Sequence, residues 1–163
     1  MILDIGCGSF PLGDVNVDAK RGVLPTYIET ISKKIVNFVF ADAEHLPFRE
    51  NTFNVVYASH LLEHVEHPFN VLLECNRVSC NVVYLHVPSP RCPNQSKYHI
   101  YRWDSNTFET LLRKVFSDVK IYSSARIVPR MGKLNMLQLI IEKLYRALFS
   151  RRQMTAICYN SRI

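Results

Sequence analysis

Seven short apolar segments, most of them separated by stretches that favour helices, constrain the fold of this chain more than any other feature. The segments are rich in β-branched and aromatic residues, and they predict strands at residues 2–5, 14–17, 35–40, 55–58, 82–87, 119–122 and 154–159. Helices are predicted at residues 26–34, 68–78, 105–115 and 134–149. This alternation indicates an α/β fold with a doubly wound, mostly parallel seven-stranded sheet.

Length and composition favour one domain spanning residues 1–163, because 48% hydrophobic residues suffice to bury a core. The formal net charge of +6 permits an RNA partner without requiring one. The five cysteines form no C-x-x-C pair, so we expect reduced thiols and a cytoplasmic protein. With neither a long apolar run nor a basic leader, we expect no membrane span and no secretion signal.

Glycine and acidic residues follow the first three predicted strands. The first strand runs into Gly6-Cys-Gly8, a turn where a missing Cβ lets a ligand approach the backbone. Asp18 ends the second strand, where its two oxygens suit the hydroxyls of a ribose. Asp42 follows the third strand. Because the carboxyl ends of parallel strands share one sheet edge, these groups predict a nucleotide-like site there.

Four motifs occur in a fixed order: Leu3-Asp-Ile-Gly-Cys-Gly, the strand-end Asp18, Ala41-Asp-Ala-Glu-His-Leu-Pro-Phe, and Phe53-Asn-Val-Val-Tyr-Ala-Ser-His-Leu-Leu-Glu-His-Val. This succession resembles the small-molecule, type 11 branch of the class I S-adenosylmethionine-dependent methyltransferases. The resemblance implies S-adenosylmethionine as cofactor and a final antiparallel strand at residues 154–159. It implies that the methionine end of the cofactor contacts Asp4, Gly6, Cys7 and Gly8, the ribose Asp18, the adenine Asp42 and Ala43, and the methyl-bearing portion Ala58, Ser59 and His60.

Catalysis of methyl transfer needs an acceptor held in line with the methyl group, and a base only where the acceptor arrives protonated. His60, His64 and His99 are the candidate bases because imidazole titrates near neutral pH. A structural role for His64 is the favoured alternative. Tyr98 and Trp103, close to His99 in sequence, belong to an aromatic cluster that either packs on the acceptor or joins the core.

The first crossover departs from the family pattern, in which a full helix joins the first two strands. Only residues 7–13 are available here, too few for a crossover helix. Fully extended, seven residues reach about 23 Å, and a five-residue strand is about 17 Å long. We therefore predict that the helix between the first two strands is missing or very short.

The function predicted is transfer of a methyl group by in-line displacement to a small-molecule or glycan-type acceptor. The main alternative is a non-catalytic module that binds cofactor or a partner protein, with the amphipathic residues 134–149 as a dimer or partner surface.

The His60-Leu-Leu-Glu-His64 sequence formally fits an inverted zinc-peptidase pattern. That pattern needs a long ligand-bearing helix, which Pro68 disfavours. No metal site is expected. A nicotinamide-dependent oxidoreductase is disfavoured because Pro11 stands where a third glycine is needed.

Overall fold

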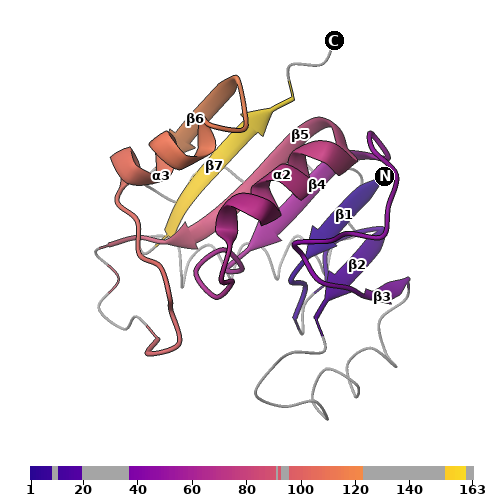
Figure 1. Cartoon of the computed structure of the whole chain (residues 1–163), viewed down its shortest axis with the longest axis horizontal. Helices are drawn as coiled ribbons and strands as arrows, with labels where there is room; N and C mark the ends of the chain where they lie inside the picture. Colours follow the sequence, from indigo (N-terminus) through magenta and orange to yellow (C-terminus); the bar gives the residue numbers. More distant parts are fainter. Residues whose placement is uncertain (9–10, 20–36, 91, 93–95, 123–152, 161–163) are drawn as a thin grey trace, which may run out of the picture.

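A seven-stranded sheet organises the computed structural model (Figure 1). The structure describes residues 1–8, 11–19, 37–90, 92, 96–122 and 153–160. The strands are β1 (Ile2–Ile5), β2 (Val15–Asp18), β3 (Phe38–Phe40), β4 (Phe53–Ser59), β5 (Ser79–Pro88), β6 (Asp118–Tyr122) and β7 (Gln153–Tyr159). The helices of the described part are α2 (Pro68–Val78) and α3 (Ser105–Leu112).

The order of strands across the sheet is β3-β2-β1-β4-β5-β7-β6. The strands β1 to β5 pair in parallel, whereas β7 runs antiparallel to both β5 and β6. The predicted fold class and the antiparallel last strand are therefore confirmed. From β1 the chain moves outward to β3 and then returns to β4 on the other side of β1, so a topological switch point lies between β1 and β4.

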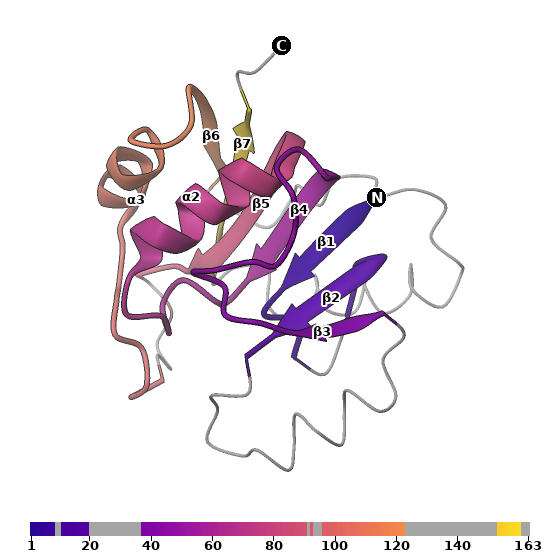
Figure 2. The same cartoon turned by 45° about the vertical axis from the view of Figure 1, so that its right-hand side comes forward.

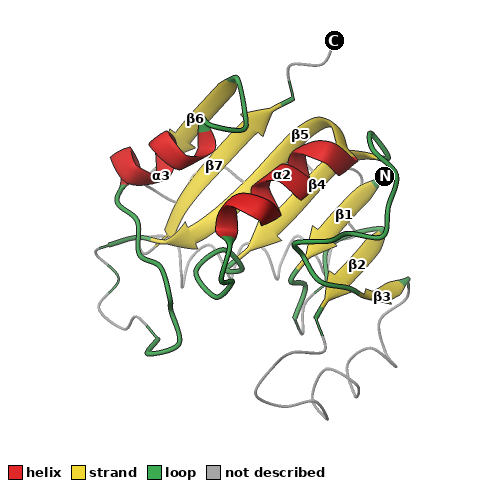
Figure 3. Ribbon diagram, in the orientation of Figure 1, coloured by secondary structure: helices red, strands yellow, loops and turns green. Residues whose placement is uncertain are grey.

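The connection between β1 and β2 is short, as predicted. None of its described residues is helical, and Figure 3 draws them as loop. The Leu12 N–H donates to Asp4 Oδ2 at 2.8 Å, which anchors the connection to β1. At Gly13, a Cβ would lie 2.4 Å from the Val15 carbonyl oxygen and 2.8 Å from the Asp4 nitrogen. Only glycine therefore fits the point where this short connection turns into β2.

Both described helices cover the same face of the sheet (Figures 1 and 2). Helix α2 begins with Pro68, whose fixed φ suits a first helical position. The buried side of α2 consists of Pro68, Val71, Leu72, Cys75 and Val78. Helix α3 begins at the capping residue Asp104, which accepts a 2.8 Å hydrogen bond from the Thr107 N–H. The buried apolar side chains of α2 and α3 pack against β4, β5 and β6 and form the core on this face.

Element boundaries differ from the sequence prediction in a few places. Strand β5 begins at Ser79 rather than residue 82, because Ser79 already pairs with Phe53 of β4. Helix α3 ends at Leu112 rather than residue 115, and Arg113 caps it by donating its N–H to the Glu109 carbonyl. The predicted helices at 26–34 and 134–149 lie outside the described residues. Among the residues described, no helix is both long and apolar enough to cross a bilayer.

Candidate functional site

A cavity of about 250 Å³ lies at the carboxyl ends of β1, β2, β3 and β4, beside the topological switch point. This is slightly below the roughly 300–1,000 Å³ typical of small-molecule sites. The cavity is lined by Ile5, Gly6, Val17, Asp18, Ala19, Ala41, Asp42, Ala43, His60, Leu61, His64 and Val65. The sheet topology thus brings together residues from all four motifs singled out in the sequence.

Gly6 forms the floor of this cavity at the end of β1. Its φ of +70° is in the left-handed region that favours glycine. Its N–H donates to the Val17 carbonyl at 2.8 Å, which ties the turn to β2. A Cβ at this position would lie 3.1 Å from Leu61 Cδ1. The missing side chain therefore keeps the cavity open between β1 and the segment after β4.

Asp18 lies at the end of β2 with its carboxylate held by two backbone groups. Its Oδ2 accepts a 2.9 Å hydrogen bond from the Gly8 N–H, and its Oδ1 accepts one of 2.8 Å from the Ala19 N–H. Burial raises the pKa of Asp18, and these two hydrogen bonds oppose that rise. A carboxylate has about four lone-pair sites, so each oxygen can still accept a hydroxyl.

Asp42 and Ala43 follow β3 on the cavity wall. Asp42 Oδ1 accepts a 2.9 Å hydrogen bond from the Glu44 N–H, which fixes a tight turn. Asp42 is exposed and Ala43 is buried. The pair therefore offers a carboxylate oxygen, Oδ2, with no hydrogen bond from any described residue, beside a small apolar surface, a combination that suits an adenine ring carrying an exocyclic amine.

Five of the predicted cofactor residues are not among the cavity-lining residues: Asp4, Cys7, Gly8, Ala58 and Ser59. Asp4 is 2% exposed and directs its carboxylate to the Leu12 N–H. Burial raises the pKa of Asp4 to about 7, the Leu12 hydrogen bond lowers it, and nearby Asp18 raises it further. Burial also raises the pKa of the Cys7 thiol to about 12, so this sulfur stays protonated at neutral pH.

His60 leaves β4 at the cavity with a φ of +55°, an uncommon conformation for a non-glycine residue. Its Nδ1 lies 2.9 Å from Glu63 Oε1 and its Nε2 lies 2.8 Å from Gln153 Nε2. An amide nitrogen can only donate, so Nε2 is the acceptor and Nδ1 carries the proton given to Glu63. Both ring nitrogens are thus occupied, which suits a positioning residue better than a base.

His64 and His99 lie side by side with ring centroids 4.8 Å apart. His64 lines the cavity, and its Nδ1 lies 3.3 Å from the Tyr98 carbonyl oxygen. Burial lowers the pKa of His99, which favours its neutral form, while the Glu63 carboxylate opposes this shift. Of the three predicted bases, His64 is the one that reaches the cavity with an unoccupied ring nitrogen among the described contacts.

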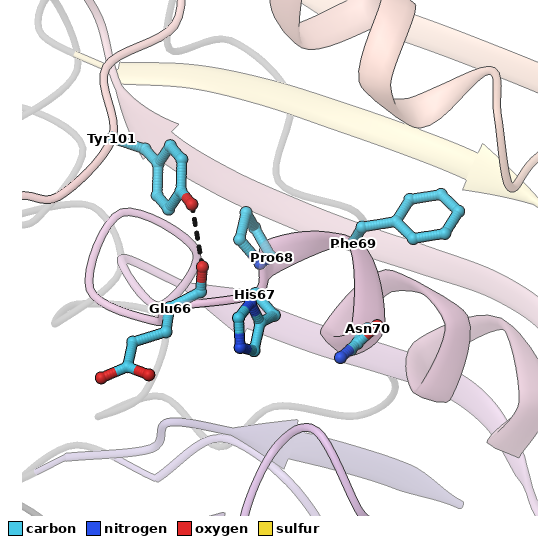
Figure 4. Close-up of a pocket in the computed structure, with 6 residues that line it drawn as sticks. All are labelled: Glu66, His67, Pro68, Phe69, Asn70 and Tyr101. Atoms are coloured by element: carbon cyan, nitrogen blue, oxygen red, sulfur yellow. Dashed lines mark hydrogen bonds between the residues drawn. The ribbon is translucent and has the colours of Figure 1, made fainter.

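The aromatic cluster after β5 divides between surface and core. Tyr101 stacks on Trp103 with a centroid distance of 5.6 Å, and Trp103 is buried. The Tyr101 hydroxyl donates to the Glu66 carbonyl at 2.8 Å (Figure 4). This bond closes one side of a shallow surface pocket of about 380 Å³ around His67. That pocket is separate from the cavity because the two share no lining residue.

The zinc-peptidase alternative loses its structural basis, because residues 60–66 form turns and bends rather than a helix. Sequence reasoning nevertheless passed over Glu63, which is fully buried. The signal was present in the same His-x-x-Glu-His pattern. Gln153 and the apolar lining residues Leu61 and Val65 were also missed, since only the fold shows that they reach this edge.

Comparison with known proteins agrees with the fold. A family model described as a methyltransferase domain matches residues 3–85. A SAM-dependent methyltransferase from Archaeoglobus fulgidus is 23% identical with a TM-score of 0.65, covering 97% of this chain and 85% of that one. One from Thermotoga maritima is 14% identical with a TM-score of 0.68, covering 98% and 82%. Phosphoethanolamine N-methyltransferase 2 of Haemonchus contortus, in complex with S-adenosyl-L-methionine, is 16% identical with a TM-score of 0.62, covering 98% and 48%.

No curated protein matches this chain in sequence. The family model nevertheless covers about half of the chain, and the chain belongs to the methyltransferase-domain family. The predicted class I methyltransferase fold is confirmed, and S-adenosylmethionine as cofactor is confirmed at the level of the family. The donor set of the cavity fits that molecule, since Gly6 leaves open space beside the strand-end carboxylate of Asp18.

Proposed function

We propose that this chain transfers the methyl group of S-adenosylmethionine to a small-molecule or glycan-type acceptor. The observation that carries the proposal is the single cavity shared by the Gly6 turn, Asp18 and the Asp42–Ala43 wall at the switch point of the sheet. Ligands of open α/β sheets bind at such switch points. A bare glycine turn would be a weak signal alone, but here it faces two acids on neighbouring strands.

Each cofactor residue has a role that its contacts support. We assign the ribose hydroxyls to Asp18, the adenine to Asp42 and Ala43, and the methionine portion to Gly6 and His60. The remaining predicted residues act through their surroundings: Asp4 holds the first connection, and Gly8 holds the Asp18 carboxylate. Ala58 and Ser59 place His60 at the end of β4, and Cys7 donates its N–H to Val17.

Methyl transfer by this chain then depends mainly on placement. Bound S-adenosylmethionine supplies an electrophilic methyl group. The chain must hold the acceptor in line with that group and exclude water. Leu61 and Val65 give the cavity an apolar wall. His64, whose ring lines the cavity, is the residue placed to take a proton from an acceptor that arrives protonated.

The cavity of about 250 Å³ is assigned to the cofactor, so a small-molecule or glycan-type acceptor is supported by the likeness of the sequence motifs to the type 11 branch. RNA remains the other acceptor class, on the basis of the net charge of +6. We further propose that residues 1–163 act as one domain and that the protein works in the cytoplasm. Free thiols at all five cysteines support a reducing compartment. A partner or dimer contact through residues 134–149 concerns a segment outside the described residues.

The second candidate is a module that binds the cofactor without turnover. It is favoured by the occupied ring nitrogens of His60, which leave no free base on that residue. A cofactor-binding site and a catalytic site share the same glycine and acidic residues, so binding alone does not separate the two functions.

A turnover assay separates the methyltransferase from the binding module. We would measure formation of S-adenosylhomocysteine with panels of small amines, small alcohols, glycans and RNA, using the wild type, Asp18→Ala and Gly6→Val. The proposal expects one acceptor class to give product, and at least tenfold lower kcat/KM in both variants. A folded wild type that binds S-adenosylmethionine but yields no product with any panel would favour the binding module.

A further inference from the structure

A group of metal-ligating side chains that runs from buried Glu63 to exposed His64 lies beside the cofactor cavity. Glu63, His64 and His99 each offer one ligand atom, and these atoms all lie within 4.8 Å of one another. The group joins the turn after β4 to the segment after β5. Backbone pairing holds the two segments together, since the Ile100 N–H donates to the Glu63 carbonyl at 2.8 Å and the Tyr101 N–H to the same oxygen at 3.4 Å.

The buried polar atoms of this group lack partners. Glu63 is 0% exposed, and its Oε2 has no hydrogen-bond partner among the described residues. His99 Nδ1 is likewise buried and unpartnered. Such atoms are costly to bury, because a group removed from water must recover its lost hydrogen bonds elsewhere. Glu63 Oε2 can only accept when ionised, and His99 Nδ1 accepts in the tautomer protonated on Nε2, so a cation between the two segments would satisfy both atoms.

The neighbours of Glu63 and His64 orient these two side chains as metal ligands are usually oriented. Glu63 Oε1 accepts from His60 Nδ1 at 2.9 Å, which leaves Oε2 for a cation. His64 Nδ1 lies 3.3 Å from the Tyr98 carbonyl, which fixes the proton on Nδ1 and leaves Nε2 with its lone pair. Ligating histidines almost always donate their other N–H in this way, and ligating carboxylates are themselves hydrogen-bonded.

We propose that Glu63, His64 and His99 bind a divalent transition-metal cation. Two imidazoles and one carboxylate match the preferences of Zn²⁺ or Fe²⁺ and disfavour Mg²⁺, which takes oxygen ligands. Ligand atoms around a tetrahedral Zn²⁺ are separated by about 3.4 Å, given bonds of about 2.0–2.1 Å. The ligand atoms lie within 4.8 Å of one another, so a closure of at most about 1.4 Å would bring them to this separation. This proposal departs from the sequence-based expectation of no metal site.

Three protein ligands leave a coordination position open. His64 belongs both to this group and to the cofactor cavity, so a cation held here would lie at the edge of that cavity. If the chain is a methyltransferase as proposed above, the cation would select acceptors with an oxygen or nitrogen that can bind it. It would also lower the pKa of such an acceptor, in the way that a metal lowers the pKa of bound water. With Nε2 of His64 on the cation, this effect would replace the proton transfer assigned above to His64, which holds only for the metal-free chain.

Calorimetric titration of the full chain with Zn²⁺, after chelator treatment and under a reductant that does not bind zinc, tests the site. We expect one Zn²⁺ per chain, and at least tenfold weaker binding in Glu63→Gln and His99→Gln. His64→Gln changes an exposed side chain, so it gives the same test with little risk to folding. His45→Gln, which alters an exposed histidine outside the group, is the matched control and should bind Zn²⁺ like the wild type.

Co²⁺ serves as the spectroscopic probe, because nitrogen and oxygen ligands give visible bands without the near-ultraviolet charge transfer of a thiolate. No Zn²⁺ binding, equal binding in the ligand variants, or a thiolate band from Cys80 or Cys92 would overturn the proposal. S-adenosylmethionine titration of metal-free wild type keeps the two proposals apart. Cofactor binding without Zn²⁺ binding refutes only the metal site, and the reverse refutes only the cofactor site.

Discussion

The Gly8 N–H donates a 2.9 Å hydrogen bond to Asp18 Oδ2, joining the turn after β1 to the end of β2. These residues are ten positions apart, with no helix in the described part of the connection between them. The bond therefore orients the Asp18 carboxylate directly from the glycine turn. The short crossover consequently keeps the acid at the cavity although its described residues form no helix.

Gly13 should be the least replaceable glycine of this crossover. A Cβ at Gly13 would lie 2.4 Å from the Val15 carbonyl oxygen, whereas a Cβ at Gly8 would meet nothing within 4 Å. Gly8→Ala should cost about 1 kcal/mol of unfolding free energy, because its φ is +50°. Gly13→Ala should cost about 3 kcal/mol or more, because backbone atoms must move. Urea denaturation measures both values, and equal losses would contradict this account of the crossover.

Asp4 should make the protein less stable as the pH rises toward neutrality. Its pKa is raised to about 7 mainly by burial in the folded state, with a smaller rise from the charge of Asp18. Because the unfolded side chain titrates near 3.8, stability is greatest below that pH and falls until about pH 7. The loss is at most about 4 kcal/mol. Asp4→Asn should remove this slope, measured as unfolding free energy at pH 4.5, 6 and 7.5.

The outcome that would contradict this reading of Asp4 is an unchanged slope in Asp4→Asn. Asp14→Asn is a suitable control, since that carboxylate accepts a hydrogen bond from the Ile2 N–H in an exposed setting. Its variant should keep the pH dependence of the wild type.

His86 should make the protein less stable as the pH falls below about 6.5, the opposite of the pH dependence expected from Asp4. It is buried on β5, and burial together with the nearby His60 lowers its pKa to about 4. The unfolded side chain takes up a proton below about 6.5, so stability falls as the pH drops from 6.5 to 4. The loss is at most about 3 kcal/mol. His86→Gln should flatten this acid limb in denaturation curves at the same pH values, and a steeper limb would refute it.

Much of the fold was predictable because strand and helix periodicities were clear. Helix α2 begins and ends at the predicted residues, since Pro68 marks its start and its apolar residues recur at helical spacing. The early start of β5 was not predictable, because Ser79-Cys-Asn reads as a turn and only pairing with β4 makes it a strand. Tertiary pairing overrode local propensity at this point.

The site was predictable where one strand end carries one acid or glycine. Gly6, Asp18 and Asp42 were found in this way, and all three line the cavity. Glu63 and Gln153 were not found, because their importance depends on their contacts with His60. Glu63 lies 3 residues from His60 in the sequence, and Gln153 lies 93 residues from it. A sequence shows which groups are available, whereas burial and missing hydrogen-bond partners appear only in the folded chain.

The central claim is that S-adenosylmethionine binds in the cavity beside Asp18, and calorimetric titration with this molecule tests it most directly. The wild type should bind with micromolar affinity, and Asp18→Asn should bind at least tenfold more weakly because it loses a charged acceptor. Asp118→Asn, on the exposed edge strand β6, should match the wild type. Absence of binding by folded wild type, or equal affinity in Asp18→Asn, would contradict the account.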